Sequence, residues 1–425
     1  MILGNLSQSL PNGGLGYFPK IGSRFENMHL QTRSDTTKFG WISMNSVFAE
    51  NFAEMATEQI QVGDKTLLHI DLAKIQDFVG AVIMSGVSPQ GGGYVVHTQG
   101  KEDGLKYLED LETGVDKSYF DAPTMDNEQV AEILRDSVDA EKMMQFGESL
   151  LEKFDTRYAK STGAAKVSNW LRKKMKRVIQ SRNDITVKSI SDGKTNQKSI
   201  VVTIEGSEPG IVILGAHLDS ISGTWEEMDL RPESAAPGAD DDGSGLIVLM
   251  EALRVIVETG YKPAKTVEIH AYGAEEIGLL GSEAIAAEYE KDNKNVVGML
   301  GFDMVGHKGD GAMPYNFAVS KDYSNQDHAD FVANLIVKYL SDNPTMLPIG
   351  IPIQPYLFFT CGYVECSDHG SFFLHGFPGN FMSEPNKTPN YHTEKDKHDD
   401  LDKDQMANNA KLALVYLAEL AKGST

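Results

Sequence analysis

Predominantly apolar, strand-like runs that alternate with helical segments constrain the fold of this chain more than any other feature. From Ile185 onward, predicted strands cover residues 199–205, 211–216, 266–271 and 296–302, and predicted helices cover residues 245–258, 282–291, 329–340 and 405–421. This alternation is typical of an α/β sheet, and continuously apolar strands indicate that helices cover both faces. We therefore predict a mixed, mostly parallel central sheet flanked by helices.

The first part of the chain has a different pattern. Up to about Glu112 it contains glycine-rich joints, strand-like runs at residues 66–70 and 94–97, and one short helical segment near residues 101–111. A second, helix-rich start follows from Asn127. Because the whole chain is longer than one typical domain, we predict a smaller α+β domain over residues 1–120 and an α/β domain over residues 126–425.

Composition excludes several classes of partner. The chain holds 61 acidic and 39 basic residues, and its formal net charge of −22 repels nucleic-acid phosphates and anionic lipid. No apolar run approaches the ~18 residues of a membrane span. We therefore expect neither nucleic acid nor a membrane as a partner. The first residues show no signal peptide, although a start methionine placed after a removed signal would look the same.

Acidic and histidine side chains follow three successive predicted strands. These residues are His217 and Asp219 after strand 211–216, Glu275 and Glu276 after strand 266–271, and Asp303 after strand 296–302. The run Asp240-Asp241-Asp242 precedes a predicted helix, and His392 lies in a later loop. Because ligands bind beyond the carboxyl ends of the strands in such sheets, we expect these side chains to share one rim.

Each of these motifs alone has a simpler explanation. The aspartate run could cap the helix that follows, and the two glutamates could occupy a solvated first helical turn. Together they supply five nitrogen and oxygen ligands without a thiolate, a set that suits zinc or a related first-row ion. Two histidines and three carboxylates exceed the needs of one open catalytic zinc, but they fill two sites if one carboxylate bridges.

Five motifs, in this order, resemble the secreted bacterial leucyl aminopeptidases with two co-catalytic zinc ions. They are His-Leu-Asp-Ser at 217–220, Pro-Gly-Ala-Asp-Asp-Asp-Gly-Ser-Gly at 237–245, Ala-Glu-Glu-Ile-Gly-Leu-Leu-Gly-Ser at 274–282, Gly-Phe-Asp-Met-Val at 301–305 and Tyr-His-Thr at 391–393. The stretch from Asp-Thr-Arg-Tyr at 155–158 to Ser-Asn-Trp-Leu at 168–171 also resembles the opening of that catalytic domain. The resemblance covers roughly residue 126 to the C-terminus.

The resemblance implies a role for each of these side chains. The zinc ligands would be Asp241, which bridges two zinc ions, His392 and Glu276 on one ion, and His217 and Asp303 on the other. Glu275 would be the general base and acid. Behind the ligands, Asp219 would orient His217, and the peptide bond between Asp241 and Asp242 would be cis.

The resemblance also suggests how a substrate would be held. Cys361 and Cys366 are similar to the pair that closes the family's disulfide loop, although here they enclose four residues, and two reduced thiols are the alternative. Tyr363 in this loop would bind the developing oxyanion. An apolar recess would hold the first residue of the substrate, because such a pocket favours apolar side chains; it would be lined by Met304, Tyr363, Met382 and Tyr391.

These features predict a monomeric zinc aminopeptidase that acts on peptides with a free N-terminus. Two alternatives stay open. One is another zinc hydrolase of the same fold, namely a carboxypeptidase, a deacylase or a glutaminyl cyclase, and the other is a non-catalytic receptor-like module. A secreted or periplasmic location follows from the resemblance and from the potential disulfide.

The segment before residue 120 resembles a prosegment that restrains activity, and an accessory domain without a regulatory role is its alternative. We expect residues 112–128 to be an exposed linker.

Overall fold

The computed structural model describes residues 119–308, 316–321, 323–341, 356–359, 366–385 and 387–425, together with strand segments 39–45, 56–62, 65–71 and 94–97 and three helical residues between 101 and 108. Within these residues, no helix is long and apolar enough to cross a membrane.

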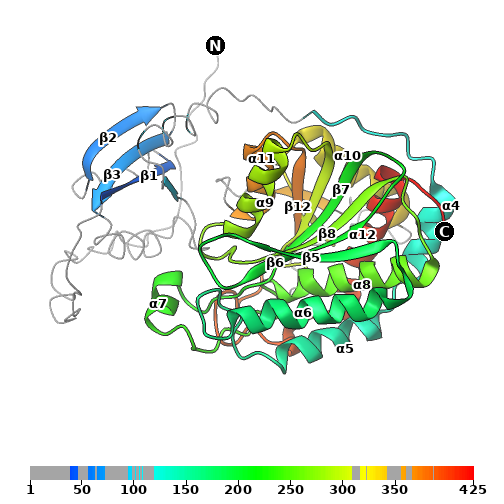
Figure 1. Cartoon of the computed structure of the whole chain (residues 1–425), viewed down its shortest axis with the longest axis horizontal. Helices are drawn as coiled ribbons and strands as arrows, with labels where there is room; N and C mark the ends of the chain where they lie inside the picture. The colour runs from blue at the N-terminus through cyan, green and yellow to red at the C-terminus, as the bar shows by residue number, and fades with distance from the viewer. Residues whose placement is uncertain are drawn as a thin grey trace, which may run out of the picture. The chain divides into compact units, whose positions relative to one another are not determined.

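An eight-stranded sheet forms the centre of the larger part of the chain (Figure 1). Its strands, in sheet order, are β11 (Tyr356–Phe359), β10 (Phe317–Ser320), β12 (Gly379–Ser383), β9 (Val296–Phe302), β7 (Glu208–His217), β8 (Lys265–Tyr272), β6 (Lys198–Ile204) and β5 (Ile185–Ser191). The four middle strands β12, β9, β7 and β8 run parallel, as do β10 and β11. The contacts of β10 with β12, β6 with β8 and β5 with β6 are antiparallel. The prediction of a mixed, mostly parallel sheet is confirmed.

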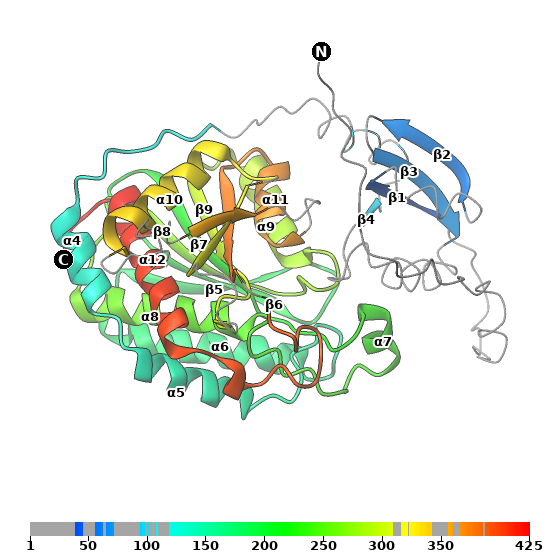
Figure 2. The same cartoon turned by 180° about the vertical axis from the view of Figure 1, so that it is seen from behind.

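Helices cover both faces of this sheet, as Figures 1 and 2 show. One face packs against a large core to which these helices contribute: α4 (Glu128–Asp136), α5 (Ala140–Leu151), α6 (Ala164–Val178), α8 (Gly243–Thr259), α10 (Gln326–Tyr339) and α12 (Lys403–Leu420). The other face packs against α9 (Leu280–Lys291) and α11 (His369–Leu374). The remaining short helices are α7 (Trp225–Leu230), η4 (Ile179–Ser181) and η6 (His398–Asp400).

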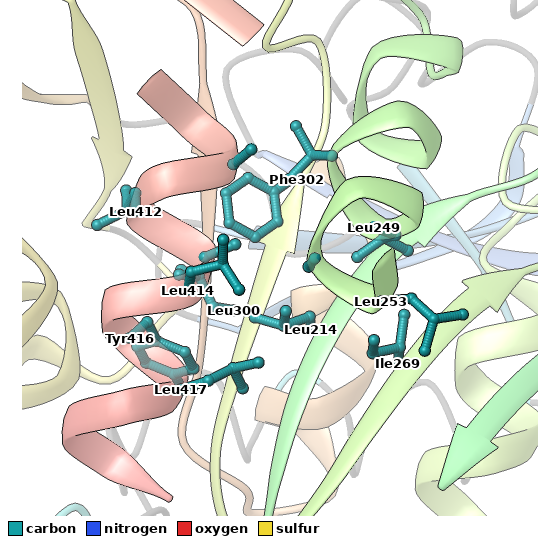
Figure 3. Packing of buried hydrophobic residues seen from close by; sticks show 14 of the residues in the cluster. Leu214, Leu249, Leu253, Ile269, Leu300, Phe302, Leu412, Leu414, Tyr416 and Leu417 are labelled. Carbon is teal, nitrogen blue, oxygen red and sulfur yellow. The ribbon is translucent and has the colours of Figure 1, made fainter. Parts of the chain in front are cut away.

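Helix α8 is buried along nearly its whole length. Leu249 and Leu253 of α8 lie in one apolar cluster with Leu214 of β7 (Figure 3). The helix ends at Gly260, whose φ of 73° is the left-handed conformation that glycine adopts most easily. Because most of its residues are apolar and buried, α8 is an interior helix, and its N-terminus lies at the carboxyl ends of the strands.

A second, four-stranded sheet lies in the N-terminal part of the chain. Its order is β2 (Ala56–Val62), β3 (Lys65–Asp71), β1 (Phe39–Asn45) and β4 (Tyr94–His97), and every neighbouring pair is antiparallel. Trp41, Leu67 and Leu108 form a small buried cluster there.

The long apolar elements match their predictions closely. Strands β9 and β4 have the predicted bounds, and β6, β7 and β8 as well as α8, α9, α10 and α12 shift by at most three residues at either end. The sequence did not reveal β1, β2 and β5, which have seven residues each, or β10, β11 and β12, which have four or five. Four or five residues carry little alternation, although the four-residue β4 was predicted.

The predicted linker is anchored to the larger domain in its second half. Phe120 is 5% exposed and contacts the rings of His328 and Phe331. The backbone N–H of Asn127 donates to Glu419 at 3.0 Å. The chain is therefore packed against the helices of the larger sheet from Phe120 onward, whereas residues 112–118 lie outside the described part.

Replacing Leu214 by Ala tests the core. The side chain is fully buried, so we expect Leu214→Ala to lower the free energy of unfolding by about 2–5 kcal/mol. The matched control is Leu230→Ala, since Leu230 is 56% exposed and should change stability by less than about 0.5 kcal/mol. Urea unfolding followed by far-UV circular dichroism measures both, and equal losses would contradict this account of the core.

Candidate metal centre

The six side chains predicted to bind metal or transfer protons lie together at the carboxyl ends of the central strands. His217 is the last residue of β7, Asp241 precedes α8, Glu275 and Glu276 follow β8, Asp303 follows β9, and His392 lies in the loop after β12. The parallel β9, β7 and β8 end at the same edge of the sheet. The topology therefore gathers residues that are up to 175 positions apart in the sequence, from 217 to 392.

Two groups of potential ligands share one carboxylate. In the first group, Nε2 of His217 lies 3.0 Å from Oδ1 of Asp241 and 3.6 Å from Oδ1 of Asp303. In the second, Nε2 of His392 lies 3.0 Å from Oδ2 of Asp241 and 3.1 Å from Oε2 of Glu276. Asp241 thus presents one oxygen to each imidazole.

The donor atoms in each group converge on a common point. The ligand atoms of His217, Asp241 and Asp303 all lie within 4.8 Å of one another, and so do those of Asp241, Glu276 and His392. A third overlapping group, His217 with Glu275 and Glu276, meets the same limit. The distances alone therefore do not decide whether Glu275 is a metal ligand or a general base.

Some buried donor and acceptor atoms at this rim have no hydrogen-bond partner, although Nε2 of His217 and Oδ1 of Asp241 are hydrogen-bonded at 3.0 Å. Nε2 of His392 and Oε1 of Glu276 both lack such a partner, although the imidazole nitrogen is close to two carboxylates. A short distance without hydrogen-bond geometry means that these groups aim at a shared point rather than at each other. Nitrogen and oxygen donors that converge in this way fit a divalent zinc ion.

The ionisable groups perturb one another strongly. Burial, followed by repulsion from Glu276, raises the pKa of Glu275 well above its usual value, and burial also raises the pKa of Glu276. Burial opposes a charge on His392, but attraction by Glu276 and contact with Asp241 raise its pKa to about 9. These ligands bind metal in their deprotonated forms, so metal binding would be coupled to the release of any protons they hold.

Asp242 links the start of α8 to the end of β7. Its Oδ1 accepts a hydrogen bond from the N–H of Gly245 at 2.9 Å, which caps the helix, and its Oδ2 accepts from the N–H of His217 at 2.9 Å. The peptide bond between Asp241 and Asp242 is cis. The aspartate run therefore both caps a helix and supplies a potential ligand.

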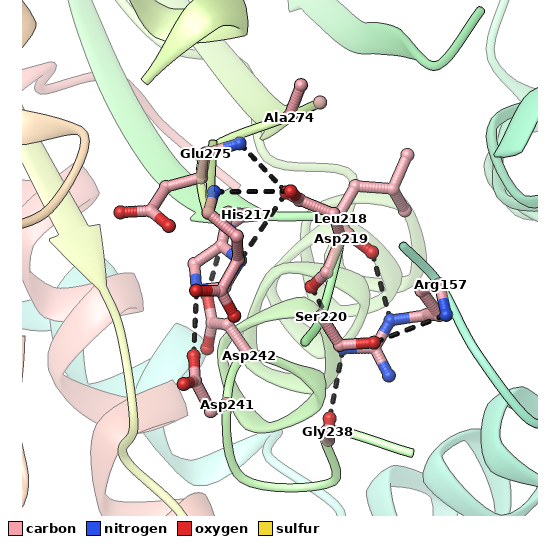
Figure 4. A network of polar contacts seen from close by, with 12 residues as sticks. Arg157, His217, Leu218, Asp219, Ser220, Gly238, Asp241, Asp242, Ala274 and Glu275 are labelled. Carbon is pink, nitrogen blue, oxygen red and sulfur yellow. Dashed lines mark hydrogen bonds and ion pairs between the residues drawn. The ribbon is translucent and has the colours of Figure 1, made fainter. Parts of the chain in front are cut away.

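Asp219 holds the loop that carries the two glutamates. Its Oδ1 accepts a hydrogen bond from the N–H of Glu275 at 2.9 Å, and its Oδ2 accepts from the N–H of Glu276 at 3.2 Å (Figure 4). Nδ1 of His217 lies 3.7 Å from Oδ1 of Asp219, which is beyond hydrogen-bond range. The main partners of Asp219 are therefore backbone N–H groups.

The sequence did not assign a role to Asp396, which supports Asp241 through its backbone. The two carboxylate oxygens of Asp396 accept hydrogen bonds from the N–H of Asp240 at 2.9 Å and from the N–H of Asp241 at 3.0 Å. The position of Asp396 four residues after His392, in His-Thr-Glu-Lys-Asp, is the signal that could have identified it. Arg157, Gln197 and Glu384 were also missed.

The predicted substrate recess is described only in part. The ring of Tyr391 stacks on His392 with centroids 3.7 Å apart, and Met304 is nearly buried next to Asp303. Met382 of β12 is fully buried in the main core. Cys361 and Tyr363 lie outside the described residues, and Cys366 is a half-cystine at the edge of the gap.

Comparison with known proteins finds relatives that are named as aminopeptidases. A probable leucine aminopeptidase 1 of Trichophyton verrucosum is 38% identical over 293 residues, which are 66% of this chain and 74% of that protein. A probable aminopeptidase of Saccharomyces cerevisiae is 37% identical over 282 residues, which are 64% of this chain and 70% of that protein.

Solved structures share the fold. LapB from Legionella pneumophila superposes with a TM-score of 0.72 at 23% identity and covers 90% of this chain and 100% of its own. The LapA aminopeptidase of the same organism gives 0.71 at 22% identity, with 91% and 99% covered. At these identities the likeness shows the fold alone.

The family model described as peptidase family M28 matches residues 199–417, which include all six side chains at the rim. The prediction of a peptide hydrolase is confirmed, and the chain belongs to peptidase family M28.

Proposed function

We propose that this chain is a dinuclear zinc aminopeptidase that removes the N-terminal residue, preferably an apolar one, from peptides with a free N-terminus. The observation that carries the proposal is the carboxylate of Asp241, whose two oxygens lie 3.0 Å from two different imidazoles. Because the two groups of three ligands share Asp241, five residues form both groups; without a shared residue, six would be needed. Relatives named as leucine aminopeptidases support the choice of reaction.

Each half of the proposed centre has one imidazole and one carboxylate of its own. His217 and Asp303 would hold one zinc ion, His392 and Glu276 would hold the other, and Asp241 would bind both. When bound, zinc would polarise the scissile carbonyl and lower the pKa of water toward neutrality.

Glu275 is the residue that we assign to proton transfer. Its side chain is half-buried beside Glu276, and its backbone N–H donates to Asp219 at 2.9 Å. A carboxylate oxygen of Glu275 would accept the proton of the attacking water and then donate it to the leaving amine. Asp219 would keep Glu275 and Glu276 in fixed relative positions, so that one binds metal while the other transfers the proton.

The specificity for an apolar first residue would come from the recess beside the rim. Met304 and Tyr391 would line it and Tyr363 would bind the oxyanion, whereas Met382 is fully buried in the main core and would lie behind the recess. We also propose that Cys361 and Cys366 form a disulfide, because Cys366 is a half-cystine and the sequence contains one other cysteine. A disulfide suits a secreted or periplasmic protein, which would act as a monomer.

Residues 1–120 would form a prosegment or accessory domain, and residues 126–425 would form the catalytic domain. The anchoring of Phe120 and Asn127 to the larger domain supports a boundary near residue 120.

Substrates that differ only at the N-terminus test the reaction. We expect about two zinc ions per chain by elemental analysis, and rapid hydrolysis of Leu-amide but not of N-acetyl-Leu-amide. Chelation should abolish the activity, and zinc should restore it. Hydrolysis of N-acetyl-Leu-amide but not of Leu-amide would indicate a deacylase, because only the acetylated amide has an acyl group to remove. An inactive zinc-loaded protein would indicate a receptor-like module.

The two adjacent glutamates should respond differently to the same substitution. Glu275→Gln should retain zinc but lose more than the ~10²–10⁴-fold in kcat that general acid–base catalysis usually contributes, since formation of the nucleophile also depends on this residue. Glu276→Gln should lower zinc content as well as kcat. Elemental analysis and Leu-amide kinetics on both variants separate the roles. Full zinc content in Glu276→Gln together with zinc loss in Glu275→Gln would reverse the assignment.

Limited proteolysis tests the role of the N-terminal part. Nicking concentrates in exposed, weakly bonded segments, and the chain from Phe120 is anchored, so productive cleavage should fall before that residue. We expect activity on Leu-amide to rise after cleavage while zinc content stays constant. Unchanged activity after clean removal of the N-terminal fragment would favour an accessory domain without a regulatory role.

A further inference from the structure

Arg157 is a fully buried arginine whose guanidinium binds backbone carbonyl groups. Its Nε donates a hydrogen bond to the carbonyl of Leu218 at 2.9 Å, and its second terminal nitrogen donates to the carbonyl of Gly238 at 2.9 Å (Figure 4). Further hydrogen bonds reach the carbonyl groups of Pro237 and Asp219. A buried charge is costly unless it is fully hydrogen-bonded, and the carbonyl groups supply those bonds.

These carbonyl groups belong to two loops that carry proposed zinc ligands. One loop runs on from His217, and the other leads to Asp241 three residues after Gly238. Gly238 has a φ of 55°, and a Cβ atom there would lie 2.3 Å from the carbonyl oxygen of Asp241 and 3.1 Å from Arg157. Because glycine has no side chain, the guanidinium of Arg157 can approach this loop closely. It thereby connects this loop to the loop that follows His217.

Gln197 connects the same arginine to the third loop of the rim. Its side-chain NH₂ donates to the carbonyl of Arg157 at 2.8 Å, and its side-chain oxygen accepts from the N–H of Ala274 at 2.9 Å. Ala274 directly precedes Glu275 and Glu276. Gln197 is itself fully buried, so water does not compete for either bond.

Arg157 is also a fixed positive charge among acidic groups. Asp219, Asp241, Asp242 and Asp396 all interact with it electrostatically. The carboxylates of Asp219, Asp242 and Asp396 are hydrogen-bonded to backbone N–H groups of the rim, whereas Arg157 takes the carbonyl groups. In the loops of the rim, backbone N–H groups are therefore bound by aspartates, and backbone carbonyl groups are bound by Arg157.

We propose that Arg157 and Gln197 are positioning residues of the metal centre. Together they fix the relative positions of the loops that carry His217, Asp241, Glu275 and Glu276, and they thereby set the affinity for zinc. The proposal rests on the function proposed above. It assigns no contact with substrate or metal to either residue.

The test is the zinc affinity of Arg157→Lys, measured by competition with a chromogenic chelator. Lysine keeps the charge but loses the planar fork that reaches both loops. Outer residues that orient metal ligands typically contribute about 10–100-fold to affinity, and we expect a loss of that size. With excess zinc, kcat on Leu-amide should fall while KM changes little.

Arg254→Lys is the matched control. Arg254 is a largely buried arginine of α8 that bonds Glu251, Glu258 and the carbonyl of Ser137, away from the rim. This variant should lower the urea midpoint without changing zinc affinity. The comparison separates a loss of general stability from a loss of ligand positioning.

Gln197→Met provides an independent variant, because it removes both hydrogen bonds at similar volume. A loss of zinc affinity in this variant would support the proposal even if Arg157→Lys did not fold. Wild-type affinity in a folded Arg157→Lys variant would overturn it, and so would failure of both variants to fold, which would indicate a purely structural role. A wild-type protein that binds no zinc would instead refute the proposed function.

Discussion

The shared carboxylate of Asp241 is the contact around which the rest of the rim is arranged. Its two oxygens lie 3.0 Å from Nε2 of His217 and from Nε2 of His392. These imidazoles come from the end of β7 and from a loop more than 170 residues later. The position of this carboxylate affects both ligand groups, because a shift of Asp241 toward one imidazole moves it away from the other. The surrounding loops must therefore hold Asp241 from its backbone.

Asp396 meets that need directly, because it accepts the backbone N–H of Asp241, and two further aspartates brace the neighbouring loops in the same way. Asp219, Asp242 and Asp396 each accept two backbone N–H groups, and in each case the two donors belong to segments that carry proposed ligands or the base. Charged acceptors form stronger hydrogen bonds than neutral ones, particularly when buried. Glu384 acts similarly further out, since it accepts from the N–H of His307 and of Thr388 and so joins the loops after β9 and β12. Acidic residues thus brace the loops as well as supply the donors.

The sequence predicted those strands and site residues that show a recognisable pattern of apolar, acidic or histidine side chains. Long apolar strands located β7, β8 and β9, and the acidic or histidine residues that follow them located the rim. Arg157 and Gln197 were not predicted, because their partners are carbonyl and N–H groups that every residue possesses and that leave no trace in the sequence. The strands β10, β11 and β12 were also missed. Four or five residues show little periodicity, but length is not decisive, because the four-residue β4 was predicted and the seven-residue β5 was not. The disulfide loop and Tyr363 stay predictions, because residues 360–365 lie outside the described part.

The aspartate run shows why a structural and a functional interpretation of one motif need not compete. Asp242 caps α8, Asp241 faces the two imidazoles, and Oδ1 of Asp240 accepts the N–H of Gly306 at 2.9 Å. Neighbouring residues at a helix start point in different directions, so three identical side chains can reach three different partners. The first turn of α8 also belongs to a helix that is buried along nearly its whole length. The turn that begins this buried helix therefore also places the shared carboxylate, and the position of Asp241 is set by the packing of the whole domain.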